Sequence, residues 1–392
     1  MTKLHLDPAT TLPADGAAGT LVGRTWLPDA DGPAVVAVRA DGLYDVSRAF
    51  PTLRDLAEAR DPAAAVAAVA GERIGALADV LANTPEDGRD PGKPWLLAPV
   101  DLQAIKAAGV TFAQSLLERV IEEQARGAPE KAAAVRAEVE GALGGAIAGL
   151  VPGSPQAAEL KRLLQGKGLW SQYLEVGIGP DAEIFTKAPP MAAVGTGASI
   201  GILEQSTWNN PEPEVVLVVN AGGAIVGAAL GNDVNLRDLE GRSALLLGKS
   251  KDNNASTAIG PFVRLFDRGF ALDDVRRGEV RLTVEGGDGF RLDATSAMAR
   301  ISRDPADLVA QMIGPHHQYP DGAVLFLGTM FAPVKDRDAP GQGFTHHAGD
   351  VVTIASDKLG ALVNVVTTCD RAPPWRFGTA ALMRNLAKRG LL

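Results

Sequence analysis

The stretch Trp208-Asn-Asn-Pro-Glu-Pro-Glu-Val-Val-Leu-Val-Val-Asn220, with Ala-Gly-Gly and then Ala224-Ile-Val-Gly-Ala-Ala-Leu-Gly-Asn-Asp233, holds two apolar runs around a short turn. Both runs are rich in β-branched residues, and an Asn-Ala-Gly-Gly turn between such runs is typical of a β-hairpin. We therefore expect two antiparallel strands within residues 208–233.

Three acidic residues mark the open end of this hairpin. Glu212 and Glu214 open the first strand and point to one face, because side chains alternate along a strand, and Asp233 closes the second strand. Three carboxylates beside buried strands repel one another unless a cation joins them. Oxygen ligands without His or Cys suit Mg²⁺ or Mn²⁺. A solvated strand end with scattered acids is the alternative that this spacing leaves open.

Composition narrows the class of protein. The 392 residues suggest one large or two ordinary domains, and a net charge of −9 disfavours a protein that tracks nucleic-acid phosphates. The single cysteine, Cys369, excludes an intrachain disulfide and favours a reduced cytoplasm. The N-terminus has no apolar signal core, and no segment has the length of a membrane span, so no membrane partner is expected.

Residues 1–95 have the pattern of a small α+β domain without a cluster of reactive side chains, which favours a role in packing or dimerisation. A loop over 83–94, rich in Pro, Gly and Asp, makes a plausible boundary. The expected elements are strands over 19–27, 34–39 and 42–47 and Ala-rich helices over 53–70 and 73–81.

Residues 96–392 change from helix to strand along the chain. Helices are expected over 111–124, 129–150 and 154–164, so that residues 111–170 form a polar helical insert suited to covering a site. Short strands with glycine turns then indicate a closed or rolled sheet. The strands are expected over 183–187, 280–284, 290–294, 322–328, 350–354 and 362–366, with a helix over 304–313.

Six pieces of this second part, in order, resemble the fumarylacetoacetate hydrolase superfamily. They are Ile184-Phe-Thr-Lys-Ala-Pro with Val194-Gly-Thr-Gly, Glu212-Pro-Glu214, Gly231-Asn-Asp-Val-Asn-Leu-Arg-Asp, Gly248-Lys-Ser-Lys-Asp with Ile259-Gly-Pro, Gly349-Asp-Val-Val, and Leu359-Gly-Ala-Leu-Val-Asn. The resemblance implies a mixed β-roll catalytic domain in homodimers or homotetramers. It also implies a Mg²⁺ or Mn²⁺ site with Glu212, Glu214 and Asp233 as ligands.

More narrowly, the chain resembles the 2-keto-3-deoxy-aldonate dehydratases of this superfamily, on the basis of Gly109-Val-Thr-Phe-Ala-Gln-Ser115, the helical insert and Trp208-Asn-Asn-Pro-Glu-Pro-Glu. Hydrolases and decarboxylases of the superfamily commonly carry His-x-x-Glu in the lid. Here the segment is Ser115-Leu-Leu-Glu118, so the acid is kept and the imidazole is lost. Because a hydrolase needs a base for water near neutral pH, this departure argues against carbon–carbon hydrolysis.

The resemblance implies a substrate and a set of roles. A 2-keto acid would chelate the cation, a base would take a proton from carbon 3, and hydroxide would leave carbon 4. We expect Glu118 to move the proton, with its pKa raised by closure of the lid, and Lys249 to bind the enolate oxygen or shuttle protons. The candidates for holding carboxylate or hydroxyl groups are Ser115, Arg119, Lys187 and Thr329.

These residues could instead have structural roles without catalysis, and the sequence leaves three functions open for the chain. Glu118 and Arg119 could form an exposed helix pair, and Lys187 could form a salt bridge either at the surface or behind the residues that touch the substrate. The first function is dehydration of a 2-keto-3-deoxy-pentonate, best 2-keto-3-deoxy-D-xylonate, to 2,5-dioxopentanoate. The second is acylpyruvate hydrolysis or oxaloacetate decarboxylation, and the third is a non-catalytic protein that binds a small molecule.

Overall fold

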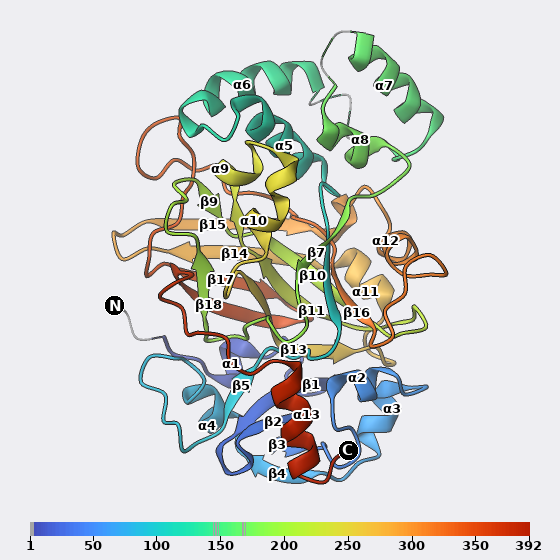
Figure 1. Ribbon diagram of the computed structural model, residues 1–392, viewed down its shortest axis with the longest axis vertical. Helices are drawn as coiled ribbons and strands as arrows, with labels where there is room; N and C mark the ends of the chain where they lie inside the picture. The colour runs from blue at the N-terminus through green and yellow to red at the C-terminus, as the bar shows by residue number, and fades with distance from the viewer. Residues whose placement is uncertain (1–3, 144, 146, 148, 167, 169) are drawn as a thin grey trace.

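The computed structural model describes residues 4–392 except 144, 146, 148, 167 and 169, and it arranges them in three tiers (Figure 1). Four helices, α5 to α8, lie at one end, the strands of two large sheets fill the middle, and strands β1 to β5 with helices α1 to α4 and α13 lie at the other end. The fold is therefore mixed α/β, as expected.

The larger sheet runs through both lower tiers. Its strand order is β4-β3-β2-β1-β13-β11-β10-β16-β6-β7, with β5 paired to β1, and only β16 and β6 are parallel in it. The bounds are β4 (Glu72–Gly75), β3 (Gly42–Asp45), β2 (Gly32–Arg39), β1 (Leu21–Leu27), β13 (Thr257–Leu265), β11 (Ile225–Asp233), β10 (Pro213–Val219), β16 (Ala323–Phe326), β6 (Ala104–Ala108), β7 (Ile184–Ala188) and β5 (Trp95–Leu97).

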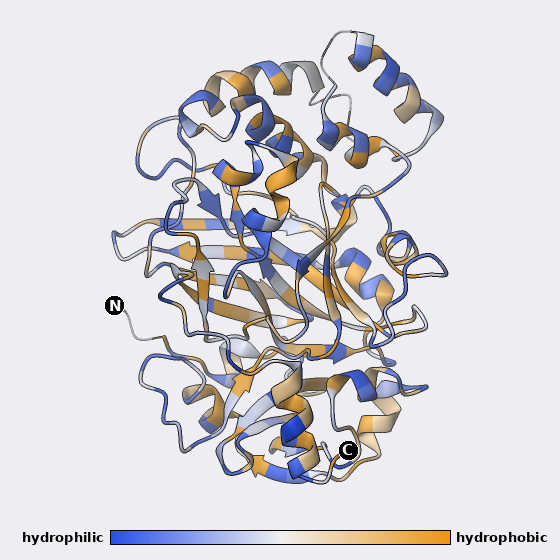
Figure 2. Ribbon diagram, viewed as in Figure 1, coloured by the Kyte–Doolittle hydropathy of each residue, from blue (hydrophilic) through white to orange (hydrophobic). Residues whose placement is uncertain are grey.

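The second sheet packs against the first and encloses the main core. Its order is β15 (Arg291–Ala297), β14 (Glu279–Glu285), β17 (Val351–Ser356), β18 (Gly360–Thr368) and β8 (Ser199–Ile202). Leu217 of β10 and Leu282 of β14 belong to one buried cluster. Strand β14 alternates buried and outward residues, whereas every residue of β10 is buried, so β10 is covered on both faces. Figure 2 shows apolar residues on these central strands and also on the helices at both ends of the molecule.

The N-terminal helices differ from those expected. A new helix begins at Pro62, because Asp61 caps it, so residues 53–70 form α2 (Leu53–Ala57) and α3 (Pro62–Ala67) rather than one helix. Residues 72–75 form β4, so the next helix starts later than expected, as α4 (Leu77–Ala82). Two short elements complete this tier, α1 (Pro8–Thr11) and the 3₁₀ turn η1 (Pro28–Ala30).

The domain boundary expected at residue 95 separates strands that belong to one hydrogen-bonded sheet. Strand β1 pairs with β13 through Leu21 and Arg264. The C-terminal helix α13 (Thr379–Lys388) also returns to the N-terminal tier, where Asn385 donates to the carbonyl of Ala30 at 2.8 Å. A boundary at residue 95 stays a prediction.

The helical insert lies over one end of the sheets. Its helices are α5 (Ala113–Ala125), α6 (Pro129–Leu143), α7 (Pro155–Gly166) and α8 (Gln172–Ile178). The expected helix over 129–150 ends at Leu143, and part of the remainder lies outside the described residues. Val110, just before α5, has φ 48, a backbone conformation that β-branched residues rarely adopt. No described helix combines the length and hydrophobicity that crossing a membrane would need.

The remaining elements are short and join the strands. They are β9 (Asn209–Asn210), which pairs with β12 (Asn235–Leu236), and α9 (Arg237–Glu240), η2 (Ala244–Leu246), α10 (Leu247–Lys251), α11 (Leu272–Arg277), η3 (Met298–Arg300) and α12 (Pro305–Met312). Helices α9 and α10 lie between the insert and the larger sheet (Figure 1), so they line the region where the expected site lies.

Candidate active site

The hairpin forms as expected and brings its three acids together. In the β10–β11 pair, Pro213 lies opposite Asn232 and Glu214 opposite Gly231, so the start of one strand meets the end of the other. Carboxylate oxygens of Glu212, Glu214 and Asp233 all lie within 4.8 Å of one another, and all three residues are buried. The alternative of a solvated strand end is therefore excluded.

The three acids have different surroundings. Glu214 accepts hydrogen bonds from the Gly328 amide at 2.7 Å and the Thr329 hydroxyl at 3.4 Å, and the described residues give it no ion pair. Burial, reinforced by the charges of Asp233 and Glu212, raises the pKa of Glu214 well above its usual value. A bound cation would remove this conflict.

Glu212 and Asp233 are paired instead with buried lysines. Lys251 Nζ lies 2.7 Å from Glu212 Oε2 and 3.2 Å from Asp233 Oδ2. Burial would raise the pKa of Glu212, but the charges of Arg119 and Lys251 outweigh it and lower that pKa. Asp233 Oδ1 lies 3.1 Å from Lys187 Nζ without a well-aligned hydrogen bond, so it keeps lone pairs that could bind a metal.

Of the two lysines that the sequence places at the site, Lys187 contacts the acids and Lys249 does not. Lys187, on β7, is fully buried, which excludes a surface salt bridge. Lys249 is exposed on α10, and the expectation that it lines the site is wrong. Lys251 takes that place, because residues two apart on a helix point about 200° apart.

Helix α5 turns a charged face toward the acids. Arg119 forms an ion pair with Glu212, a second with Glu122 Oε2 at 2.6 Å, and a third with Glu240 Oε1 at 3.4 Å. Glu118 is 3% exposed and Arg119 is 6% exposed, so the alternative of an exposed helix pair is excluded. The insert therefore contributes charge to the site in addition to covering it.

Glu118 is held by two arginines. Arg237 Nη2 lies 2.6 Å from Glu118 Oε2, and Arg136 of α6 donates to both carboxylate oxygens. Burial would raise the pKa of Glu118, but the two guanidinium groups outweigh it and hold that pKa below its usual value. The expected upward shift is thus wrong for this arrangement, and Glu118 is ionised at neutral pH.

Two further acids were not singled out from the sequence. Glu240 of α9 is buried, and burial raises its pKa to about 7 although Arg119 and Lys251 oppose the shift. Glu183, before β7, also has its pKa raised by burial, and it packs against Gly109, where a Cβ would lie 2.0 Å from its carboxylate. A signal existed for Glu240, because it follows Arg237 by three residues, the spacing of neighbours on one helix face.

The remaining candidates, Ser115 and Thr329, form hydrogen bonds with neighbouring residues. Ser115 donates to the Phe112 carbonyl at 2.9 Å within its own helix, and Thr329 lies against Glu214. Among the described residues no histidine contacts the three acids. His346 is buried beside Asp350, with 3.2 Å between Nδ1 and Oδ2, in keeping with a packing role.

The charge of the whole cluster fits a divalent cation. The described residues supply seven carboxylates and five cationic groups, an excess of two negative charges if all are ionised. These are Glu118, Glu122, Glu183, Glu212, Glu214, Asp233 and Glu240 against Arg119, Arg136, Arg237, Lys187 and Lys251. The acids at the hairpin end could therefore hold a hard divalent cation.

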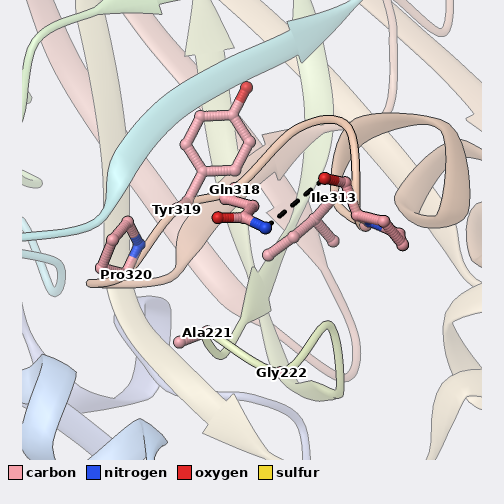
Figure 3. Close-up of a pocket in the computed structure, with 8 residues that line it drawn as sticks. Ala221, Gly222, Ile313, Gln318, Tyr319 and Pro320 are labelled. Atoms are coloured by element: carbon pink, nitrogen blue, oxygen red, sulfur yellow. Dashed lines mark hydrogen bonds between the residues drawn. The ribbon is translucent and has the colours of Figure 1, made fainter.

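One pocket lies beside this cluster, and another lies at the turn of the hairpin. The first, of about 200 Å³, is lined in part by Arg136, Trp208 and Arg237. The second, of about 330 Å³, lies at the turn of the hairpin, where Ala221 and Gly222 line it together with Gln318, Tyr319 and Pro320 (Figure 3). The residues lining the second pocket include no carboxylate, lysine, arginine or histidine, so its position does not mark the chemistry.

Comparison with known proteins agrees with this geometry. Residues 177–367 match the model of the fumarylacetoacetate (FAA) hydrolase C-terminal family. A probable 2-keto-3-deoxyxylonate dehydratase of Haloferax volcanii is 32% identical over 196 residues, or 50% of this chain and 64% of the relative. A 2-dehydro-3-deoxy-D-arabinonate dehydratase of Saccharolobus solfataricus is 30% identical over 191 residues, or 47% of this chain and 58% of the relative. The matches thus span about six-tenths of each relative's length.

Solved structures share the fold over a longer range. A 2-keto-3-deoxy-D-arabinonate dehydratase in its apo form has a TM-score of 0.60 and 18% identity, over 89% of this chain and 99% of that chain. The same named enzyme, complexed with magnesium and 2,5-dioxopentanoate, gives 0.59 with the same identity and the same coverage. At this identity the likeness establishes the fold alone.

Proposed function

We propose that this chain, in which residues 177–367 form a domain of the fumarylacetoacetate hydrolase family, is a metal-dependent dehydratase. The substrate is a 2-keto-3-deoxy-pentonate, best 2-keto-3-deoxy-D-xylonate, and the product is 2,5-dioxopentanoate. The names of the two relatives and the magnesium and 2,5-dioxopentanoate bound in a structure of the same fold support this assignment.

The buried triad of Glu212, Glu214 and Asp233 carries the proposal. An unsatisfied Asp233 oxygen, the raised pKa of Glu214 and the all-oxygen donor set fit Mg²⁺ or Mn²⁺. Such a cation, when bound, would acidify the carbon next to the keto group and stabilise the enolate charge.

The protein's own groups supply binding and proton transfer. Arg119 and Lys187 can hold the substrate carboxylate and Lys251 can stabilise the enolate oxygen, because all three are cations buried beside the triad. Ser115 and Thr329 can hydrogen-bond the substrate hydroxyls. Glu118 is assigned as proton acceptor, since its lowered pKa keeps it ionised at neutral pH.

The reaction balances as loss of one water. The carbon-3 proton moves to Glu118, the double bond between carbons 3 and 4 forms as the bond from carbon 4 to its hydroxyl breaks, and the hydroxide leaves as water with the proton that Glu118 has taken. A proton then moves from carbon 5 to carbon 3, which shifts the double bond. The remaining carbon-5 hydroxyl is then part of an enol after the double bond shifts, and the enol tautomerises to the aldehyde of 2,5-dioxopentanoate.

The decisive experiment uses the metal-stripped full chain with added Mg²⁺ or Mn²⁺ and a panel of 2-keto acids. Loss of 2-keto-3-deoxy-D-xylonate or -D-arabinonate, coupled to NADPH formation by an aldehyde dehydrogenase, is the expected result. Pyruvate released from an acylpyruvate or oxaloacetate, without turnover of the pentonates, would instead assign a hydrolase or decarboxylase. Metal binding without turnover of any acid would indicate a binding protein.

Assembly and compartment belong to the same proposal. We expect a cytoplasmic homodimer or homotetramer, in line with the family resemblance and with a single thiol, Cys369, whose pKa is raised by burial. Light scattering on the purified chain measures the assembly directly, and a monomer at micromolar concentration would contradict it.

A further inference from the structure

Two buried carboxylates share the same two cations beside the proposed metal centre. Arg119 pairs with Glu212 through Nη2 and lies 3.4 Å from Glu240 through Nε. Lys251 Nζ lies 2.7 Å from Glu212 and 3.9 Å from Glu240. The four side chains thus form a closed ring of alternating charge, with each cation closer to Glu212.

The ring is built from separate elements and is shielded from solvent. Arg119 comes from α5, Glu240 from α9 and Lys251 from α10, and all of them are at most 6% exposed. Glu240 Oε2 has no hydrogen-bond partner among the described residues, whereas its carbonyl accepts from the Tyr173 hydroxyl at 3.5 Å. Its carboxylate therefore has unused capacity on the side that faces Lys251.

We propose that Glu240 is a positioning residue that retains Arg119 and Lys251 at the site when Glu212 serves a divalent cation. This inference rests on the metal-dependent function proposed above. Glu212 cannot neutralise two side-chain cations and a divalent cation at full strength, because all three compete for one charge. Glu240 gives Arg119 and Lys251 a second buried partner and leaves Glu212 free for the metal.

A matched pair of variants tests this role. Glu240→Gln keeps the shape of the side chain and removes its charge. Asp238→Asn removes the same charge from the same helix, but Asp238 binds Ser206 and Thr207 and contacts neither cation. Without Glu240, both cations stay on Glu212 and oppose the metal.

Binding of Mn²⁺ to the purified full chain, followed by electron paramagnetic resonance, is the first measurement. We expect Mn²⁺ to bind about tenfold more weakly to Glu240→Gln than to wild type, and to bind within about twofold of wild type in Asp238→Asn. Equal losses in both variants would show a general effect of charge and overturn the positioning role.

A second readout separates positioning from structural support. Arg119 and Glu122 from α5, Lys251 from α10, Tyr173 from α8 and Glu212 are the titratable or charged groups that act on Glu240. Because burial raises the pKa of Glu240 to about 7, its negative charge develops between pH 6 and 8. The gain in Mn²⁺ affinity over this range should be smaller in Glu240→Gln, and an identical pH dependence in both proteins overturns the proposal.

Failure of the proposed function has a different signature. If wild type does not bind Mn²⁺, the metal centre itself is wrong; if wild type and Glu240→Gln bind it equally, only the role of Glu240 is wrong. Should Glu240→Gln fail to fold, Glu240→Asp is the variant to measure, because it keeps the negative charge on a side chain that is shorter by one methylene group. That variant is expected to bind Mn²⁺ several-fold more weakly, and wild-type affinity in it would overturn the inference.

Discussion

The two ends of one hairpin differ in what they could do. At the open end, Glu212, Glu214 and Asp233 are buried among lysines and arginines. At the turn, Ala221 and Gly222 border a pocket of about 330 Å³ whose lining carries no ionisable acid or base except the phenol of Tyr319 (Figure 3). Both ends belong to the same two strands, so buried charge rather than a hollow surface distinguishes the end that we propose to be reactive.

The physical reason is the cost of burying charge. An ionised group away from water is retained only where partners compensate for lost hydration, and a cluster with excess negative charge calls for a cation. The turn end carries less buried charge: the Glu58 carboxylate accepts a hydrogen bond from the Ala221 amide at 2.7 Å, and the side chains of Gln318 and Tyr319 line the pocket. The following predictions test this contrast, from the largest expected effect to the smallest.

Glu214→Gln removes one charge of the triad while it keeps the side-chain shape. We expect binding of Mg²⁺ or Mn²⁺ to be lost and kcat/KM on the pentonate substrate to fall by roughly a thousandfold or more, because the cation contributes several kcal/mol to such reactions. Isothermal titration calorimetry and the coupled assay measure the two effects. Normal binding of Mg²⁺ by this variant would remove Glu214 from the ligand set.

Lys251→Met and Lys249→Met compare two lysines on one short helix. Lys251 contacts Glu212 and Asp233, whereas Lys249 is exposed. We expect turnover to fall by roughly 10²- to 10⁴-fold in the first variant and to stay within about twofold of wild type in the second. The reverse result would restore the sequence-based assignment of Lys249.

Glu118→Gln tests the proton acceptor on α5. We expect kcat to fall by roughly 10²- to 10³-fold with Mn²⁺ affinity unchanged, because Glu118 contacts Arg136 and Arg237 and none of the three triad acids. The control is Glu123→Gln, since Glu123 lies on the same helix and pairs with Gln172 at its surface. Full activity of Glu118→Gln would show that another group takes the proton.

The stability of the metal-free protein should depend on pH through Glu240. Its folded pKa of about 7 lies above the ordinary value, so its stabilising contribution is complete at acidic pH and is lost as pH rises through 7. From pH 5 to pH 8 we expect the free energy of unfolding in urea to decline by roughly 1 to 3 kcal/mol more in wild type than in Glu240→Gln. Parallel curves for the two proteins would contradict the raised pKa.

Gln318→Ala probes the turn end and should have the smallest effect. Within the described part of the chain, its amide donates to the Pro315 carbonyl at 3.4 Å, in an exposed loop (Figure 3). We expect kcat/KM within about twofold of wild type and a stability change within about 0.5 kcal/mol. A large loss of activity would mean that the turn-end pocket takes part in catalysis, against the contrast drawn above.

The parts of the fold that could be predicted from the sequence are those with strong local patterns. The hairpin was predicted correctly because a glycine turn between β-branched runs has few alternatives. The single helix expected over 53–70 was wrong, since an Ala-rich run hides the new start at Asp61 and Pro62. The return of α13 to the N-terminal tier depends on packing between residues far apart in sequence, and no local pattern reports it.

The residues of the candidate site likewise fall into those that local patterns predict and those that they do not. The three acids followed from strand alternation and hairpin register, which are local rules. Lys251 was missed, because a five-residue helix is too short to show which of its lysines turns inward. Glu240 was missed although its spacing of three residues from Arg237 places the two on one helix face. The direction of the pKa shift of Glu118 was also beyond the sequence, since it depends on Arg136 and Arg237 from other elements.

The contact between Asn385 and Ala30 joins residues 355 positions apart, and it has a consequence for biosynthesis. On the ribosome, strands β1 and β2 emerge long before β13 and α13, their neighbours in the finished molecule. The apolar edges of the N-terminal tier therefore stay uncovered until β13 and α13 have been synthesised. A fragment that stops after residue 95 is expected to aggregate or be degraded in the cell rather than accumulate as a folded unit.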